Sequence, residues 1–298
     1  MRALVAVIIL VAGGTALLVA TGSPPFSGAD GEARPATEVP RPNVNRFPGR
    51  SAYRSVERQV ALGPRPAGSA ALRKLAGRLV RALPRGRLEA VPGHPGLRNV
   101  IGTLRGREPE RLVVLGAHYD TKDIPGFVGA NDGASGTAIV TRIARTLKPR
   151  RLGPTIEFIL FDGEESPAGT PDSQFAEKGL RGSKAVASRY ADAEAMILLD
   201  FVGEKGLRVP REASSSPDLW GRLRAAATRV GVAPVFPRQT QGSILDDHVP
   251  FLQQGMPAID LIDFDFPCWH RRCDDLSRVS QRSLDAVGET VIQLLRDL

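Results

Sequence analysis

The sequence predicts an α/β fold, a three-layer sandwich in which helices cover both faces of a mainly parallel, mixed central sheet. Two observations lead to this fold class. Short apolar runs typical of buried strands alternate along the chain with amphipathic helical patterns, which is the order expected when helices connect the strands of a parallel sheet. The chain also has 298 residues, 42% of them hydrophobic, which is enough for the core of one large domain.

The first 50 residues precede the predicted domain. Arg2 is followed by an uncharged run, residues 3–20, near the lower end of the ~17–25 residues that span a bilayer. Residues 1–22 are therefore interpreted as either a membrane anchor or a cleaved signal peptide, and a positive N-terminus directs the remainder of the chain out of the cytoplasm in both cases. Residues 23–50 are rich in Pro, Gly and Arg and predict a flexible tether. We expect an exported protein, either anchored by its N-terminal segment or secreted or periplasmic.

Residues 51–298 are predicted to form a single catalytic domain, because strand and helix patterns continue to the C-terminus without an internal repeat. Helical patterns at 51–63 and 70–83 open the domain and are separated by Gly63-Pro64-Arg65-Pro66, a helix-breaking segment. The strand-like runs are 97–104, 111–117, 155–161, 196–201 and 257–262. The remaining helical patterns are 135–147, about 180–190, 217–230 and 280–297.

Acidic and histidine side chains gather where the predicted strands end. The carboxyl ends of parallel strands share one edge of the sheet, where binding sites are built, so these side chains are expected to lie together. They are His118 and Asp120 after RLVVLGA, Asp132 before the helix at 135–147, Glu164 and Glu165 after TIEFILF, Asp200 ending AMILLD, Asp246 and Asp247 in a loop, and His270 after PAIDLI.

Each of these residues also has an ordinary structural interpretation when it is taken alone. Asp132 suits a helix N-cap, His118 a hydrogen-bonded core position, and Asp200 a strand that ends in water. Their convergence instead favours a metal site, because zinc takes nitrogen and carboxylate ligands and keeps an open position in catalytic centres. Neighbouring side chains diverge in extended backbone, so one of Glu164 and Glu165 can bind the metal while the other faces the substrate as a proton carrier.

The charge and the cysteine content indicate which partners and which covalent links the protein can have. The net charge of +8 comes without a basic patch interleaved with aromatic residues, so we expect surface arginines and no nucleic-acid partner. Only two cysteines occur, Cys268 and Cys273, in PCWHRRC. In an exported domain they form either a short-loop disulfide or two separate thiols.

Six further segments occur in this order along the chain: GAHYDTK, GANDGASG, FDGEES, LLDFVG, DDHVPFLQQGMPAIDLI and WHRRCDDL. Together they resemble the zinc-aminopeptidase superfamily often called the M28 family. The resemblance runs from about residue 61 to the C-terminus, includes LGPRPAGSAA, and implies a zinc-exopeptidase-like fold. Two activities occur in that family: aminopeptidases use two zinc ions to hydrolyse an N-terminal peptide bond, and glutaminyl cyclases use one zinc to convert N-terminal Gln to pyroglutamate.

Three features are similar to the cyclases: the insert SPAGTPDSQFAEKGL after FDGEE, the acid Asp246 before Asp247-His248, and Trp269 before His270. The resemblance then implies a residue-by-residue assignment. Asp132, Glu165 and His270 match the ligands of one zinc ion per chain, Glu164 matches the general acid/base, Asp200 and Asp246 match a hydrogen-bonded acid pair beside it, and Trp269 matches a wall of the Gln pocket.

His118 could serve as a ligand of a second metal ion, so the alternative is a zinc aminopeptidase with two metal ions. A third interpretation, a non-catalytic ectodomain, has no use for a base beside the metal. We therefore expect a glutaminyl-peptide cyclotransferase that acts on the N-termini of peptides or proteins. It is expected to be a monomer that meets the membrane only through its N-terminal segment.

Overall fold

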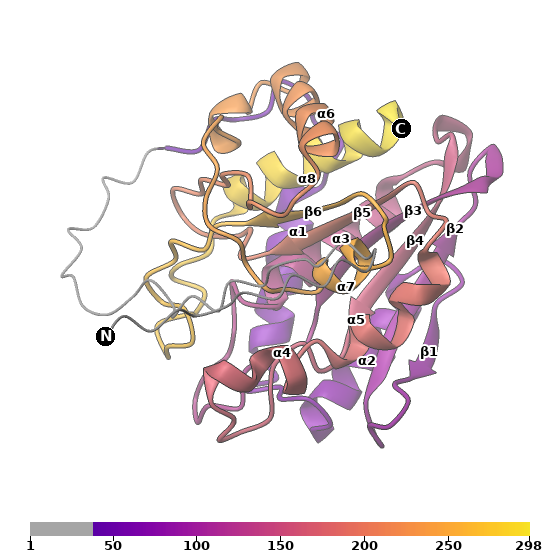
Figure 1. Cartoon of the computed structure of the whole chain (residues 1–298). Helices are drawn as coiled ribbons and strands as arrows, with labels where there is room; N and C mark the ends of the chain where they lie inside the picture. Colours follow the sequence, from indigo (N-terminus) through magenta and orange to yellow (C-terminus); the bar gives the residue numbers. More distant parts are fainter. Residues whose placement is uncertain (1–37) are drawn as a thin grey trace, which may run out of the picture. The chain divides into compact units, whose positions relative to one another are not determined.

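The computed structural model describes residues 38–298, which form one compact unit with a six-stranded sheet in the order β1-β2-β4-β3-β5-β6. The predicted N-terminal anchor or signal peptide and the start of the tether, residues 1–37, lie outside the described residues. Strands β3 to β6 run parallel to one another, while β1 and β2 pair antiparallel at one edge (Figure 1). The strands are β1 Arg87–Ala90, β2 Arg98–Leu104, β3 Glu108–His118, β4 Pro154–Phe161, β5 Ala195–Asp200 and β6 Ala258–Ile262.

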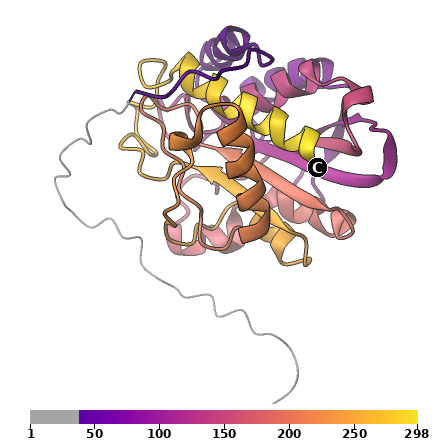
Figure 2. The same ribbon diagram turned by 90° about the horizontal axis from the view of Figure 1, so that it is seen from above.

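Helices cover both faces of the sheet, as the alternating pattern predicts. Successive residues of a strand point to opposite faces: Leu160 packs in the core beneath α1, α2, α3, α6 and α8, and Phe161 packs in the core beneath α5 and α7. Figure 2 shows α6 and α8 side by side over the first of these faces. The helices are α1 Gly49–Val60, α2 Ala70–Ala82, α3 Ala134–Thr146, α4 Phe175–Lys178, α5 Arg181–Val186, α6 Pro217–Arg229, α7 Val249–Leu252 and α8 Gln281–Asp297.

Local sequence explains where these elements begin and which side they bury. Helix α2 starts after Ser69, whose side chain accepts a hydrogen bond from Leu72 N, as a Ser N-cap does. It buries Leu72, Leu75, Ala76 and Leu79, an i, i+3, i+4, i+7 stripe. Every residue of the central strand β4 is buried, which accounts for the apolar run 158–161 at its end.

Two parts of the described fold differ from the sequence-based expectation. Strand β1 was not predicted, because this edge strand is mostly exposed and so carries no apolar run. Residues 38–50 are expected to belong to the flexible tether, and this assignment is wrong for the described part. Phe47 is buried in the main core, its backbone N–H donates to Glu289 at 2.6 Å, and α1 begins at Gly49. Val39 is buried in the same core and Arg46 pairs with Glu289 at 3.0 Å, so a few anchored side chains fix a segment whose composition resembles a linker.

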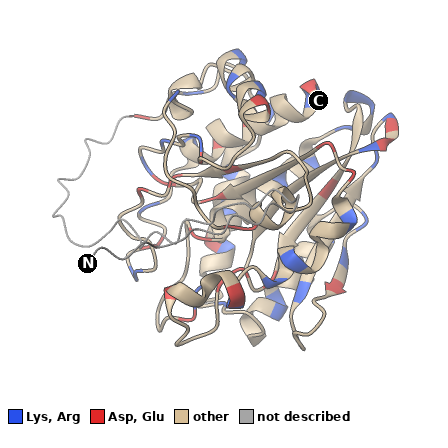
Figure 3. Cartoon of the chain, in the orientation of Figure 1, with Lys and Arg blue, Asp and Glu red and all other residues tan. Residues whose placement is uncertain are grey.

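Lys and Arg side chains are spread over many elements and are interspersed with acids (Figure 3). Among the described residues no helix is both long enough and apolar enough to cross a membrane.

Candidate active site

The carboxyl edge of the parallel strands brings the predicted residues together. His118 ends β3 in register with Phe161 at the end of β4, so the loop that carries Glu164 and Glu165 leaves the sheet beside it. Asp200 ends the neighbouring strand β5. Asp132 enters from the loop before α3, and His270 from the loop after β6.

His118 lies at the centre of the carboxylates. Its Nε2 is 3.2 Å from Oδ1 of Asp132 and 3.2 Å from Oδ1 of Asp200, and its Nδ1 is 3.8 Å from Oε2 of Glu164. Burial lowers the pKa of His118, but the surrounding carboxylates, Asp200 first, raise it well above its ordinary value. This excess of negative charge in a buried site is what a bound cation neutralises.

Asp132 joins two groups of possible metal ligands. It lies with His118 and Asp200 in one group and with Glu165 and His270 in the other, and within each group the ligand atoms are all within 4.8 Å of one another. The imidazole and carboxylate donors suit zinc. Oδ2 of Asp132 is also buried without a hydrogen-bond partner among the described residues, which leaves it available to an ion. The residues present therefore fit a metal at either position.

The two adjacent glutamates lie in different electrostatic environments. Glu165 contacts His270 Nε2 at 3.1 Å and Lys122 Nζ at 3.0 Å. Burial raises the pKa of Glu165, but His270 and Lys122 have the larger, opposite effect, and the pKa falls from 4.5 to about 2. Burial, with repulsion from Glu165 and Asp246, raises the pKa of Glu164 well above its ordinary value. One carboxylate is thus kept ionised beside another that binds a proton tightly, an arrangement that separates a ligand from a proton carrier.

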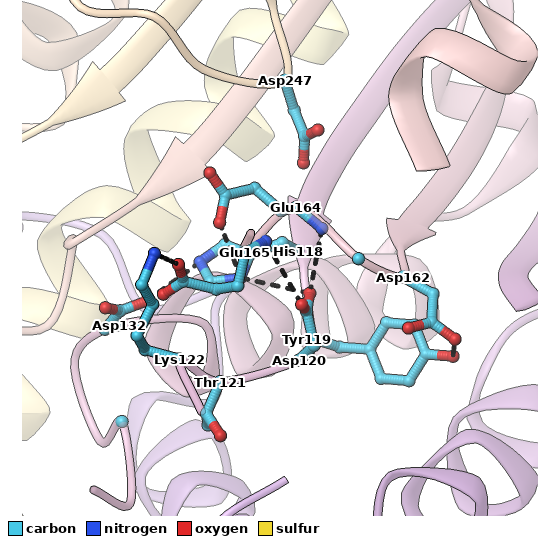
Figure 4. Close-up of polar contacts among 12 residues, drawn as sticks. His118, Tyr119, Asp120, Thr121, Lys122, Asp132, Asp162, Glu164, Glu165 and Asp247 are labelled. Carbon is cyan, nitrogen blue, oxygen red and sulfur yellow. Dashed lines mark hydrogen bonds and ion pairs between the residues drawn. The ribbon is translucent and has the colours of Figure 1, made fainter. Parts of the chain in front are cut away.

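Asp120 holds the backbone of this pair in place. Its two carboxylate oxygens accept hydrogen bonds from Glu164 N at 3.3 Å and Glu165 N at 3.2 Å (Figure 4). Figure 4 also shows Asp247 pointing toward Glu164 from the loop that precedes α7. Because both backbone donors end on one buried carboxylate, the side chains of Glu164 and Glu165 leave the chain in fixed and different directions.

The loop that carries Asp132 is held in a similar way. Asp274 accepts from Asn131 N at 2.7 Å and from Asp132 N at 3.0 Å. Gly133 follows at φ +77°, and a Cβ at this position would approach the carbonyl oxygen of Asp120 to 2.7 Å. Only glycine avoids that clash at a positive φ, so this residue lets α3 start directly behind Asp132.

Asp200 and Asp246, expected as an acid pair, have different hydrogen-bond partners in the structure. Asp200 directs Oδ1 to His118, while Oδ1 of Asp246 accepts from the backbone N–H of Asp247. Asp246 still acts on Asp200 through space: burial and the Asp246 charge raise the pKa of Asp200 to about 7, against the opposing effect of His118. Burial and the same Asp246 charge raise the pKa of Asp260 in β6 well above its ordinary value. The buried acids of this region therefore extend to a third carboxyl.

Trp269 and His270 form one stacked unit. Their rings lie 4.4 Å apart with an interplanar angle of 25°, and Phe264 packs against Trp269 at 5.4 Å. A disulfide joins Cys268 to Cys273 across this segment, one of the two alternatives that the sequence leaves open. His270 has φ +50°, a left-handed conformation that is uncommon for residues other than glycine, and the closed loop holds it there.

Four residues that shape the site have no role assigned from sequence: Arg65, Lys122, Asp260 and Asp274. Each lies inside one of the segments that resemble the family, so its position in the sequence could have indicated a role in the site. Asp260 offered the clearest one, because it is a single acid within the apolar strand PAIDLI.

Comparisons with known proteins agree with this geometry. A family model described as Peptidase family M28 matches residues 99–295. The chain is 27% identical over 240 residues to a glutaminyl-peptide cyclotransferase of Bos taurus, covering 66% of this chain and 65% of that protein. The chain thus spans slightly less than two thirds of that relative's length.

Solved structures match over more of the chain. A glutaminyl cyclase of Porphyromonas gingivalis has a TM-score of 0.75 and 33% identity, covering 85% of this chain and 99% of that one. A Zn-dependent exopeptidase from Parabacteroides distasonis has a TM-score of 0.74 and 28% identity, with the same coverage. The three-layer α/β fold is therefore shared with proteins of both kinds.

Proposed function

The chain belongs to peptidase family M28, and on that premise we propose that it is a zinc-dependent glutaminyl-peptide cyclotransferase. It converts an N-terminal Gln of a peptide or protein to pyroglutamate and releases ammonia. The observation that carries this proposal is the buried acid Asp246, which belongs to neither group of possible metal ligands, yet raises the pKa of both Glu164 and Asp200. A reaction that moves a proton from one nitrogen to another has a use for such additional carboxyls.

Asp132, Glu165 and His270 are the residues that would hold the zinc ion. When bound, zinc supplies Lewis-acid polarisation of the substrate's γ-carbonyl. Lys122 and His270 keep Glu165 ionised, as a ligand carboxylate must be. The name of the Zn-dependent exopeptidase that shares the fold supports zinc as the metal.

Glu164 carries the proton in this proposal. The substrate α-amine attacks the γ-carbonyl carbon, a new C–N bond forms, the bond to the side-chain amide nitrogen breaks, and that nitrogen leaves as ammonia. Glu164 accepts the proton that the amine loses and delivers it to the leaving nitrogen. Its raised pKa makes the ionised carboxylate a stronger base than an exposed glutamate. Because the attack is intramolecular, holding the Gln side chain in a folded conformation lowers the barrier.

Trp269 is the proposed wall of the Gln pocket. It is only partly buried and its ring is fixed between His270 and Phe264. A flat apolar surface beside a ligand residue suits the methylene groups of a small side chain. The disulfide that encloses this segment also supports our proposal that the domain is exported, since disulfides persist in oxidising compartments.

One experiment separates the two activities of the family. The purified protein, loaded with zinc, is incubated with a Gln-initiated peptide and, separately, with a Leu-initiated peptide of otherwise identical sequence, and the products are analysed by mass spectrometry. The cyclase proposal expects loss of ammonia from the first peptide and no change in the second. Release of the N-terminal Leu without loss of ammonia from the Gln peptide would reject it.

The aminopeptidase is the second candidate, and one observation favours it. His118, Asp132 and Asp200 form a second group of possible metal ligands that shares Asp132 with the first, as a two-metal hydrolase requires. Metal content decides between the two: the cyclase proposal expects a single zinc per chain, whereas the aminopeptidase expects two.

A further inference from the structure

A cavity of about 320 Å³ lies between α1, α2 and α3, and none of its lining residues belongs to the candidate active site. Five arginines line it, and no Asp or Glu does. We call this cavity the arginine pocket. Its arginines come from all three helices: Arg58 from α1, Arg78 and Arg81 from α2, and Arg142 and Arg145 from α3.

Some arginines elsewhere on the surface form ion pairs with acids. Arg111, for example, contacts Glu194 at 2.6 Å and Glu108 at 2.7 Å, and Arg87 contacts Glu157 at 3.0 Å. Within the range 38–298 no such ion pair forms at any arginine of the pocket. The chain therefore has acids available for pairing but places none at this cavity.

Arg142 is the most enclosed of the five. Its side chain is partly buried, and its Nε has no hydrogen-bond acceptor in the described part of the chain. Burial lowers its pKa, and repulsion from Arg145 and Arg58, which line the same cavity, lowers it further. The Nε of Arg145, by contrast, donates to the carbonyl oxygen of Ala82 at 3.2 Å. The unpaired, buried Nε of Arg142 is unfavourable unless something else accepts its hydrogen bond.

Phosphate chemistry matches what the pocket offers. A guanidinium group presents a planar fork of donors that binds phosphate oxygens through paired, charge-assisted hydrogen bonds. A phosphate monoester carries about −1.5 to −2 charges at pH 7, so two of them balance most of the five positive charges. The volume is near the lower end of small-molecule pockets, which are roughly 300–1,000 Å³. Helices supply every lining arginine, and this gives the pocket a rigid frame.

We propose that the arginine pocket binds a small molecule carrying two phosphate groups, at a site separate from the catalytic centre. Arg142 and Arg145 hold the ligand from α3, and Arg78 and Arg81 close over it from α2. A free metabolite and a phospholipid headgroup share this chemistry, so the source of the phosphates is part of the test. The proposal does not depend on which reaction the catalytic centre performs.

Calorimetric titration of the zinc-loaded protein with fructose 1,6-bisphosphate tests the proposal, with fructose as the uncharged control. We expect saturable binding of the bisphosphate that weakens as salt is added, and none of fructose. The variant R142Q/R145Q should bind at least about tenfold more weakly, the order expected when charge-assisted hydrogen bonds are lost. R78Q/R81Q changes only exposed residues of α2 and should give a similar loss without affecting the fold.

The matched control is R150Q/R151Q, which also removes two positive charges, but from exposed positions outside the pocket. It should leave the affinity unchanged, and an equal loss in this control would overturn the proposal in favour of non-specific attraction. Co-sedimentation with vesicles that contain cardiolipin, a lipid whose headgroup carries two phosphates, forms a second arm. Vesicle binding that both pocket variants abolish would identify a lipid headgroup as the source. Absence of bisphosphate binding and of vesicle binding at millimolar ligand would also overturn the proposal.

Discussion

Replacing Arg65 with Met should destabilise the domain far more than replacing an exposed arginine. Arg65 is completely buried, and its guanidinium donates to four backbone carbonyls: Gln59 and Gly63 near the end of α1, and Val128 and Gly129 in the loop before Asp132. Burial lowers the pKa of Arg65 to about 10 against the opposing attraction of Asp132, Asp274 and Asp120, so the side chain remains charged at neutral pH.

The size of the effect depends on the groups that lose a partner. Methionine fills much of the volume, but the four carbonyls lose their donor, and Asp132, Asp274 and Asp120 lose a buried counter-charge. Removing one partner from a buried charged network costs about 3–5 kcal/mol, a large part of the total stability of a typical domain, about 5–15 kcal/mol. Because two of the carbonyls belong to the loop that carries Asp132, zinc affinity should fall as well.

Urea unfolding, followed by circular dichroism in the metal-free and zinc-loaded states, measures the loss. The control is Arg73→Met, which removes an exposed arginine that donates to one carbonyl, that of Gly68, and should change stability by no more than about 0.5 kcal/mol. If Arg65→Met lost less than about 1 kcal/mol of unfolding free energy, or kept its zinc affinity, the buried guanidinium would not be what organises the Asp132 loop.

Four further predictions concern the site and the pH dependence. Glu164→Gln should retain zinc, as measured by atomic absorption, and lose about 10²–10⁴-fold in kcat, whereas near-normal turnover would exclude it as the proton carrier. His118→Ala should leave a single zinc per chain, and a fall from two to one would favour the aminopeptidase. Cys273→Ser should lose about 2 kcal/mol, as expected for opening so short a loop, with thiol labelling of the unreduced parent protein as the check. Burial raises the pKa of Glu212, but His248 has the larger, opposite effect, and the pKa falls from an ordinary 4.5 to about 2. Because the pKa is lower in the folded state, ionised Glu212 stabilises the fold above about pH 5, and this stabilisation is lost as the pH falls toward 2. Glu212→Gln should therefore flatten the acid limb of the stability profile, and an unchanged limb would contradict this.

The sequence was informative about the fold wherever burial leaves a periodic signal. Strands β3, β4 and β5 are almost wholly apolar where they cross the core, and their predicted limits agree closely with the observed ones. Strand β1 and the one-turn helices α4 and α7 were not predicted, since four residues are too few to show a period. The attachment of Phe47 depends on Glu289, more than 240 positions away, and no local pattern reports such a contact.

The convergence of the candidate ligand residues was predictable for a topological reason. Parallel strands deliver their carboxyl ends to one edge, so a polar residue after each apolar run is enough to assemble His118, Glu165 and Asp200 without any knowledge of distances. The surroundings of each acid were not predictable in this way. Asp246 is expected beside Asp200, but its charge also acts on Asp260, because β6 lies beside β5 and presents a buried acid that the strand pattern gave no reason to assign.

Asp132 explains why the same residues are compatible with two reactions. It is the shared member of both groups of possible ligands, so the framework for a second metal is present whichever activity the protein has. What differs between the two groups is their surroundings. Around Glu165 and His270 the charge is balanced by Lys122, whereas Asp200 lies near the further acids Asp246 and Asp260. A proton on these acids can reduce the charge on that side in place of a second cation, since neighbouring buried carboxyls cannot all ionise. We therefore expect the balance between one metal and two to depend on how tightly the buried acids near Asp200 hold their protons. Asp260 is the residue whose replacement should change that balance without altering a candidate ligand.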